Sequence, residues 1–133
     1  MTRPKLISLI AATVLADQLS KVAALSLLSQ GTAVPVLPGF NLALGFNEGA
    51  SFGMMGGVMA GMPLLMATLT GALALVFAFM ALRAQHPLER AGFALVVGGA
   101  LGNILDRMRQ GAVTDFLDLY WRDWHWPTFN VAD

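Results

Sequence analysis

The sequence predicts a mainly α-helical protein that crosses a membrane several times, and two observations carry this prediction. Hydrophobic residues make up 56% of the 133 positions and charged residues only 12%, about half of the roughly 25% that is usual in soluble domains. Three segments are also apolar over lengths near the ~20 residues that a helix needs to cross a bilayer. The length predicts one domain, and the zero net charge gives no indication of a nucleic-acid partner.

The first apolar segment, residues 6–28, is interrupted by Asp17 and Lys21. A secretory signal peptide is one alternative, because basic residues precede the apolar run and residues 14–16 resemble a cleavage site. The apolar pattern resumes after Lys21, however, and two further hydrophobic segments follow. We therefore expect a membrane-spanning helix.

The other two segments are expected to be helices that differ in apolar length. Residues 58–82 carry no charge over 25 positions, and Pro63 lies near the start, where a helix tolerates proline. The third segment, residues 91–105, would span only about 22 Å as a helix, at about 1.5 Å per residue. Because this is shorter than the ~30 Å hydrocarbon core, we expect the helix to continue through Asp106 and Arg107.

Shorter patterns predict how the helices pack and what connects them. Gly98 and Gly102 lie four residues apart, and small residues at this spacing let another helix approach closely. Between the first two helices, apolar side chains alternate over residues 40–46, which indicates a short strand. One tyrosine and three tryptophans gather within residues 120–126, and amphipathic aromatic side chains favour a membrane interface.

The distribution of basic residues predicts the orientation in the membrane by a small margin. Four of them flank ends that would be cytoplasmic, and three lie in the last segment, residues 106–129. Because the first helix usually dominates the positive-inside rule, we expect the N-terminus inside and residues 106–129 outside.

Ionisable residues within the apolar segments are candidates for function, since charges are costly in lipid. Asp17 and Lys21 are four residues apart, so they share a helix face and can pair. This pair either docks helices or takes part in a site, and the residues leave both roles open. Asn103, Asp106 and Arg107 form a second group, for which an ordinary helix end with an Asp–Arg pair at the surface is the alternative.

Two carboxyl groups near the end of the chain are candidates for catalysis. Asp115 lies between apolar neighbours, where desolvation raises the pKa of a carboxyl group. Asp133 has a similar setting after Phe129 and Val131. Each alone fits a helix cap better than a catalytic group. Together they could share a proton, one acting as base toward water and the other as acid toward a carbonyl oxygen, although their spacing does not show that they meet.

These residues occur in five blocks that resemble the bacterial lipoprotein signal peptidases, also called signal peptidase II. The blocks are DQLSK at 17–21, NEGASF at 47–52, GGALGNILDR at 98–107, GAVTDF at 111–116 and FNVAD at 129–133. Each block is short, and the second reads as a plain turn on its own. Five blocks in family order nevertheless extend from residue 17 to the last residue.

The resemblance implies an aspartic endopeptidase of the bacterial inner membrane, with its site near the extracytoplasmic face. The enzyme would cut prolipoproteins just before a diacylglyceryl-modified Cys, would contact membrane lipid, and would act as a monomer without a cofactor. Its catalytic pair would be Asp115 and Asp133. The residues that bind substrate or shape the site would be Asp17, Lys21, Asn47, Gly49, Asn103, Arg107, Asn130 and Ala132. Whether Asn47 and Asn130 hold the substrate backbone or orient the carboxyl groups stays open.

The family fold that the resemblance implies is a bundle of four transmembrane helices with a small extracytoplasmic sheet. The sheet and its loop would fall within residues 33–56. The fourth helix would open with the Asn-x-Ala-Asp motif that ends this sequence. The resemblance therefore implies a single peptidase domain that is truncated at that point, and we expect the chain as written to be inactive.

The residue content also limits the other classes of function. The chain has no cysteine, and its two histidines, His86 and His125, are far apart, so a thiol nucleophile is excluded and a metal site is disfavoured. A small proton- or ion-coupled transport subunit with Asp17, Lys21 and Asp115 as relay groups is an alternative, and a structural subunit whose charges pair helices is another. Transport folds often contain internal repeats, and the sequence shows none.

Overall fold

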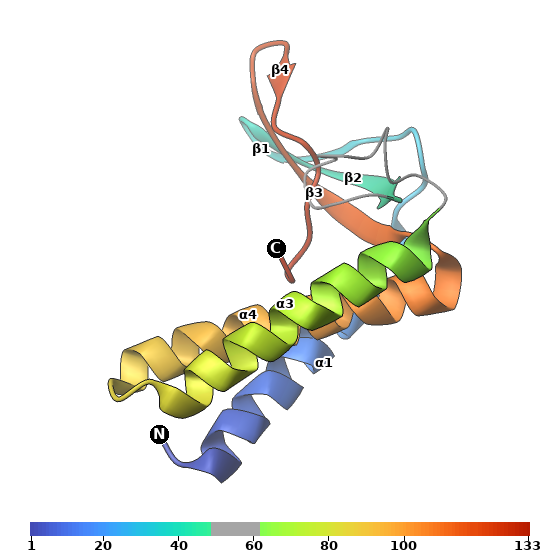
Figure 1. Ribbon diagram of the computed structural model, residues 1–133. Coiled ribbons are helices and arrows are strands. Elements are labelled where there is room, and N and C mark those ends of the chain that lie inside the picture. Colours follow the sequence, from blue (N-terminus) through green and yellow to red (C-terminus); the bar gives the residue numbers. More distant parts are fainter. Residues whose placement is uncertain (49–61) are drawn as a thin grey trace.

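The computed structural model describes residues 1–48 and 62–133. Within these residues it contains three long helices and a four-stranded antiparallel sheet (Figure 1). The helices are α1 (Arg3–Leu27), α3 (Pro63–Arg83) and α4 (Pro87–Gln110), and the strands are β1 (Val34–Leu37), β2 (Phe40–Asn47), β3 (Val113–Trp121) and β4 (Trp124–His125). Each of the three helices is long and apolar enough to cross a membrane. The predicted fold class, mainly helical with several spans and a small sheet, is confirmed.

A proline in the first turn opens each of these helices. Pro4, Pro63 and Pro87 occupy positions where the missing N–H costs no hydrogen bond within the helix. The helices agree with the predicted spans, except that residues 58–61 lie outside the described residues. Because α4 ends at Gln110, the predicted continuation of the third helix past residue 105 is confirmed.

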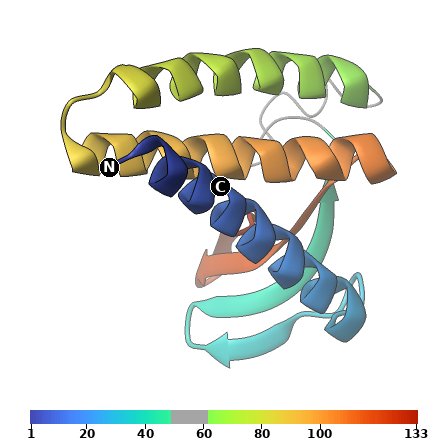
Figure 2. The same ribbon diagram turned by 90° about the horizontal axis from the view of Figure 1, so that it is seen from below.

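The helix α4 lies between the other two, with α3 along one side and α1 crossing it diagonally (Figure 2). Glycines make the crossing close. A Cβ atom at Gly98 would lie 2.6 Å from the Cβ atom of Thr13, and one at Gly102 would overlap the carboxylate of Asp17. The close helix partner that the glycine spacing predicts is therefore α1.

The largest side chains buried in this structure are polar, and many large apolar side chains lie on the outside of the helices. The largest fully buried side chains are Lys21, Asn130, Thr114, Asp17 and Asp106. Large apolar side chains on the helices are exposed instead, among them Leu15, Leu64, Leu75, Phe79 and Leu88. This distribution is the one expected when lipid, and not water, is the solvent around the helices.

The sheet draws half of its strands from the end of the chain. Its order is β1-β2-β3-β4, with Phe40 opposite Leu119 and Asn47 opposite Val113. The expectation that the sheet falls within residues 33–56 is therefore wrong for β3 and β4. The reason is that β2 needs a hydrogen-bonding partner along its inner edge, and the nine residues of β3, which begins at Val113 shortly after α4, provide it.

Gly111 produces the change from helix to strand that creates β3. Its φ of 80° is in the left-handed region, and its N–H donates to the carbonyl oxygen of Arg107, which ends α4. Asp115 then lies four residues further on, in an extended strand. The interpretation of Asp115 as a helix cap or helix-end residue is therefore wrong.

We predict that Gly98→Ala lowers the thermal stability of the protein in detergent, by about 1–3 kcal/mol in free energy of unfolding, because the new methyl group overpacks the contact with Thr13. The matched control is Gly92→Ala on the same helix, where a Cβ atom meets nothing within 4 Å. An equal loss of stability in the two variants would contradict the close crossing of α1 and α4.

Candidate active site

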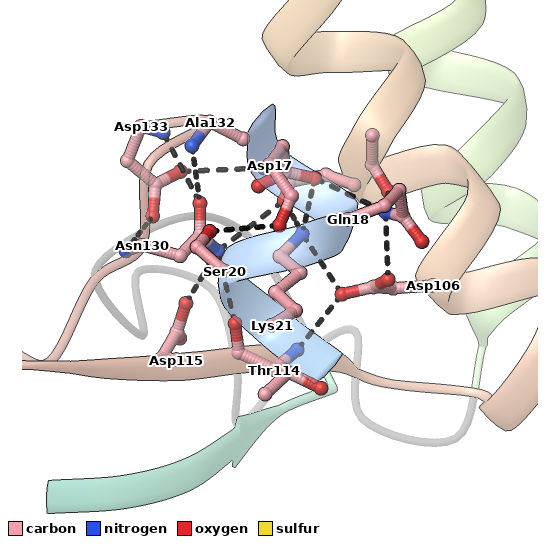
Figure 3. Close-up of polar contacts among 12 residues, drawn as sticks. Asp17, Gln18, Ser20, Lys21, Asp106, Thr114, Asp115, Asn130, Ala132 and Asp133 are labelled. Carbon is pink, nitrogen blue, oxygen red and sulfur yellow. Dashed lines mark hydrogen bonds and ion pairs between the residues drawn. The ribbon is translucent and has the colours of Figure 1, made fainter. Parts of the chain in front are cut away.

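The ammonium group of Lys21 is the centre of a buried polar cluster between α1, α4 and β3 (Figure 3). Its Nζ lies 2.9 Å from Asp17 Oδ2, 3.0 Å from Asn103 Oδ1 and 2.9 Å from Asp106 Oδ2. The side chains of Lys21, Asp17 and Asp106 have no exposed surface. An ammonium group has three N–H donors, so these three acceptors use all of them. The predicted pairing of Asp17 with Lys21 is confirmed, and Asp106 joins it.

Asp106 connects this cluster to the strand β3. Its Oδ2 accepts a hydrogen bond of 3.1 Å from the backbone N–H of Thr114, the residue before Asp115. Its Oδ1 accepts from Gln18 Nε2 at 3.2 Å and from Arg109 at 3.4 Å. The alternative of an Asp–Arg pair at the surface is therefore wrong, because the side chain of Asp106 is fully buried between a lysine and a backbone donor.

Asn130 binds both carboxyl groups, that of Asp115 through its side chain and that of Asp133 through its backbone. Its Nδ2 donates to Asp115 Oδ1 at 2.8 Å, and its backbone N–H donates to Asp133 Oδ2 at 3.2 Å. Its Oδ1 accepts from the backbone N–H groups of Ala132 and Asp133, at 2.8 and 3.2 Å. The structure thus brings the two carboxyl groups onto one asparagine, which their separation in sequence could not show.

Asn103 joins the lysine cluster to this asparagine. Its Oδ1 accepts from Lys21 Nζ and, at 3.3 Å, from Asn130 Nδ2. Its Nδ2 donates to Asp133 Oδ1, also at 3.3 Å. A continuous chain of hydrogen bonds therefore runs from the ion pair on α1 to both carboxyl groups.

The two carboxyl groups have different surroundings. Asp115 is 3% exposed, whereas Asp133 is an exposed residue. Burial, followed by the negative charge of Asp133, raises the pKa of Asp115 from 3.8 to about 7, against the hydrogen bond from Asn130 and the positive charges of Lys21 and Arg107. Asp115 is therefore able to hold a proton near neutral pH.

The remaining residues expected at the site lie near this centre to different degrees. Arg107 is 5% exposed on α4. Ala132 adjoins Asp133 and lies so close to Gly99 that a Cβ atom there would overlap the Ala132 carbonyl. Asn47 is half-buried at the end of β2, opposite Val113 of the strand that carries Asp115. Gly49 lies outside the described residues.

Three residues of the cluster were missed as site residues in the sequence. Gln18 donates to Asp17, to Asp106 and to the carbonyl oxygen of Gly102. Thr114 supplies the N–H that binds Asp106, and Gly99 gives room for the backbone at Ala132. All three lie inside the blocks that carried the resemblance. Their chemistry is ordinary for a helix or strand, so neither composition nor spacing pointed to them.

An apolar groove opens next to Asp133. It has a volume of about 480 Å³ and is lined by Ala12, Thr13, Ala16, Leu95, Val96, Val131, Ala132 and Asp133. Residues 1–48 and 62–133 contain no group of three or more His, Asp and Glu side chains placed to hold a metal ion. The site brings together carboxyl, amide, hydroxyl and basic side chains.

Fold and site together define an integral membrane protein with two carboxyl groups held on one buried asparagine. The model of the family described as Signal peptidase (SPase) II matches residues 9–133. The chain therefore belongs to the signal peptidase II family, whose members are aspartic peptidases.

Individual relatives and solved structures agree with this assignment. The chain is 42% identical over 120 residues to the lipoprotein signal peptidase of Polynucleobacter necessarius, covering 90% of this chain and 74% of that protein. It is 41% identical over 134 residues to the lipoprotein signal peptidase of Syntrophotalea carbinolica, covering 97% and 82%. Two solved structures described as bacterial membrane enzymes superpose with TM-scores of 0.84 and 0.81, at 25% and 27% identity, over 98% of this chain and 79% and 84% of theirs.

We predict that Lys21→Met destabilises the protein by ~3–5 kcal/mol, because it leaves Asp17 and Asp106 buried without their cation. Adding Asp106→Asn to this variant should recover part of the loss, since one of the stranded charges is then removed. Thermal unfolding in detergent measures both effects, with the exposed Lys5→Met on the same helix as the control. If Lys21→Met and Lys5→Met unfold at the same temperature, the buried cluster does not hold α1 to α4.

We also predict a dependence of stability on pH that belongs to Asp115. Its raised pKa means that the folded protein binds this proton more tightly than the unfolded chain does. The resulting stabilisation is complete below about pH 3.8 and is lost as the pH rises through about 7. It amounts to about 4 kcal/mol at most, at about 1.4 kcal/mol for each unit of pKa.

Replacing Asp115 by Asn should remove this dependence. Unfolding temperatures of the wild type should therefore fall more steeply than those of Asp115→Asn between about pH 5 and about pH 8. Asp123→Asn, which changes an exposed carboxyl group, should keep the wild-type profile. Parallel profiles for the wild type and Asp115→Asn would contradict the raised pKa.

Proposed function

We propose that this chain removes signal peptides from diacylglyceryl-modified prolipoproteins, by cleavage just before the lipidated Cys, with Asp115 and Asp133 as the catalytic pair. The observation that carries the proposal is the placing of both carboxyl groups on Asn130, one buried and one exposed. The proposal is supported by the family match and by relatives named lipoprotein signal peptidase. One chain supplies all of these residues, so the proposal needs only a monomer.

In the proposed reaction the two carboxyl groups start with one proton between them, held by Asp115. Asp133, as the base, accepts a proton from a water molecule whose oxygen attacks the scissile carbonyl carbon. Asp115, as the acid, gives its proton to the carbonyl oxygen, which yields a neutral tetrahedral intermediate. The C–N bond then breaks as the nitrogen takes the proton from Asp133, and the intermediate's hydroxyl returns one to Asp115. The original protonation state of the pair is restored.

Asn130 has an orienting role in this proposal. Its amide group contacts acceptors on Asp115, Thr114 and Asn103 and accepts two backbone N–H groups, so none of its bonding capacity is left for substrate. Asn103, which itself accepts a hydrogen bond from Lys21, accepts another from Asn130 and so holds its side chain in position. Asn47, which adjoins the start of β3, is left as the candidate for holding the substrate backbone.

The site is proposed to face the extracytoplasmic side of the bacterial inner membrane. The first residue, the end of α3 and the start of α4 meet at the other end of the helices, where Arg90 donates to the carbonyl oxygens of Met1 and Ala84. That end carries four basic residues. Of the three at the site end, Arg107 is buried and Arg109 contacts Asp106. The larger number of basic residues at the end away from the site supports the orientation that the positive-inside rule favours.

The alternative of a proton- or ion-coupled transport subunit finds no support in the family match. A relay needs ionisable groups at several depths across the membrane. Here Asp17, Asp106, Asp115 and Asp133 are instead linked in one cluster through Lys21, Asn103 and Asn130.

We predict that Asp115→Asn gives a folded protein whose cleavage rate on an acylated prolipoprotein falls at least about 100-fold, because Asn keeps the shape but cannot exchange a proton. The rate is measured in detergent with acylated and non-acylated substrate, on the sequence as written and on the same sequence extended by an apolar segment of about 20 residues, so that the expected inactivity of the shorter chain is tested with it. Asp118→Asn is the matched control, since it changes a buried carboxyl group on the same strand that contacts His125 and Asn41. Equal rates for Asp115→Asn and Asp118→Asn would overturn the assignment of the pair.

A further inference from the structure

The tip of the β3–β4 hairpin carries a surface that the proposed chemistry does not use. Trp121, Trp124 and Trp126 are 73%, 60% and 43% exposed, and they are the three tryptophans of the chain. Tryptophan is highly buried on average in soluble proteins, so three exposed within six residues need a partner other than water. We call residues 120–126 the hairpin tip.

The position of the sheet brings the hairpin tip to the level of the membrane surface. In both views the strands lie alongside the helices and not beyond their ends (Figures 1 and 2). The helix α4 has 24 residues and is therefore about 36 Å long. Because the hydrocarbon core is only ~30 Å thick, the last turns of α4 reach the headgroup region, and the sheet beside them lies next to lipid.

The chemistry of the hairpin tip fits that region of a bilayer. An indole ring is apolar over most of its surface and has one N–H donor, so it is most stable between hydrocarbon and water. Arg122 lies with its Cζ 5.9 Å from the ring centre of Trp121, which places a cation beside the indole, where phosphate groups would be. The strand β1, at the opposite edge of the sheet from β4, adds further exposed apolar side chains, Val34, Val36 and Leu37.

Contacts within the sheet make the hairpin tip a rigid extension of β3. His125 Nδ1 lies 2.8 Å from Asp118 Oδ1, and Asn41 of β2 donates to Asp118 Oδ2 at 3.3 Å. The ring of Tyr120 stacks on His125 at 5.4 Å. Trp121 is six residues from Asp115 on the same strand, about 20 Å at roughly 3.3 Å per residue. A force on the tip is therefore transmitted to the strand that carries Asp115.

We propose that the hairpin tip binds the headgroup region of the bilayer, with Trp121, Trp124 and Trp126 in contact with lipid, and so sets the height of Asp115 above the membrane. The proposed contact with lipid does not depend on the proposed function. The consequence for Asp115 rests on the proposed function, since a diacylglyceryl anchor fixes the height of the scissile bond in the same way.

The test uses the intrinsic fluorescence of the tryptophans, because all of it comes from the hairpin tip. The full chain is placed in vesicles of phosphatidylethanolamine and phosphatidylglycerol whose acyl chains carry bromine near the headgroup or near the methyl end. Three variants, each with two of the tryptophans replaced by Phe, report one position at a time. Bromine near the headgroup should remove most of the emission of each variant, bromine near the methyl end much less, and aqueous acrylamide little.

A depth control comes from α3. In a background with all three tryptophans replaced by Phe, Leu73→Trp places one indole at an exposed position in the middle of that helix, where bromine near the methyl end should quench most. Strong quenching of the hairpin tip by acrylamide, without quenching by bromine, would show a tip in water and overturn the proposal. Emission that neither quencher reaches would show a tip covered by protein, such as a second copy, and would overturn it too.

The consequence for catalysis is tested separately with two triple variants. Replacing the three tryptophans by Ser should slow cleavage of an acylated prolipoprotein several-fold in vesicles, whereas replacing them by Phe should not, and the difference should shrink in detergent micelles. Equal rates for the two triple variants in vesicles would overturn the height-setting role. If the wild type itself cleaved no acylated prolipoprotein, the proposed function would be wrong. The quenching by bromine would still show whether the hairpin tip contacts lipid.

Discussion

The burial of the Lys21 ammonium group is the constraint on which the rest of the site depends. A charge among lipid-facing helices is stable only when all of its donors are satisfied, and three acceptors do this for Lys21. Two of them, Asn103 and Asp106, belong to α4 and lead onward: Asp106 binds the backbone of Thr114, and Asn103 binds Asn130 and Asp133. The position of one cation on α1 therefore fixes α4, the start of β3 and the loop with the second carboxyl group.

Glycines on two faces of α4 make this arrangement sterically possible. Gly98 and Gly102 admit α1, and Gly99 admits the backbone at Ala132. One helix thus packs against both the ion-pair helix and the segment that carries Asp133, within two turns. Side chains at these positions would push apart the groups that the hydrogen bonds join. The polar cluster therefore depends on these glycines, because the space they leave on α4 lets its polar side chains pair with the neighbouring segments.

The helices could be predicted almost completely, but the site only in part. Length and apolar composition predicted all three spans, and the four-residue spacing predicted the contact between Asp17 and Lys21. For Asp106 a surface ion pair stayed open as an alternative, because its place at a helix end is also typical of a solvent-exposed pair, and its burial depends on Lys21, 85 positions earlier. The strand β3 was not predicted from the sequence. Its residues are buried without alternation from Val113 to Phe116, so the two-residue period that indicates a strand is absent.

The sequence by itself determined that this protein belongs in a membrane, which side chains are costly there, and which glycines allow close packing, because these properties depend on local composition and on the helical repeat. Only the tertiary structure decided that Asp115 and Asp133 both bind Asn130, and that one is buried while the other is exposed. Those facts depend on a strand and a loop that approach from positions 15 residues apart and on a cation on a third element. No local pattern encodes such distances, because the chain between the residues is free to turn until long-range contacts fix it.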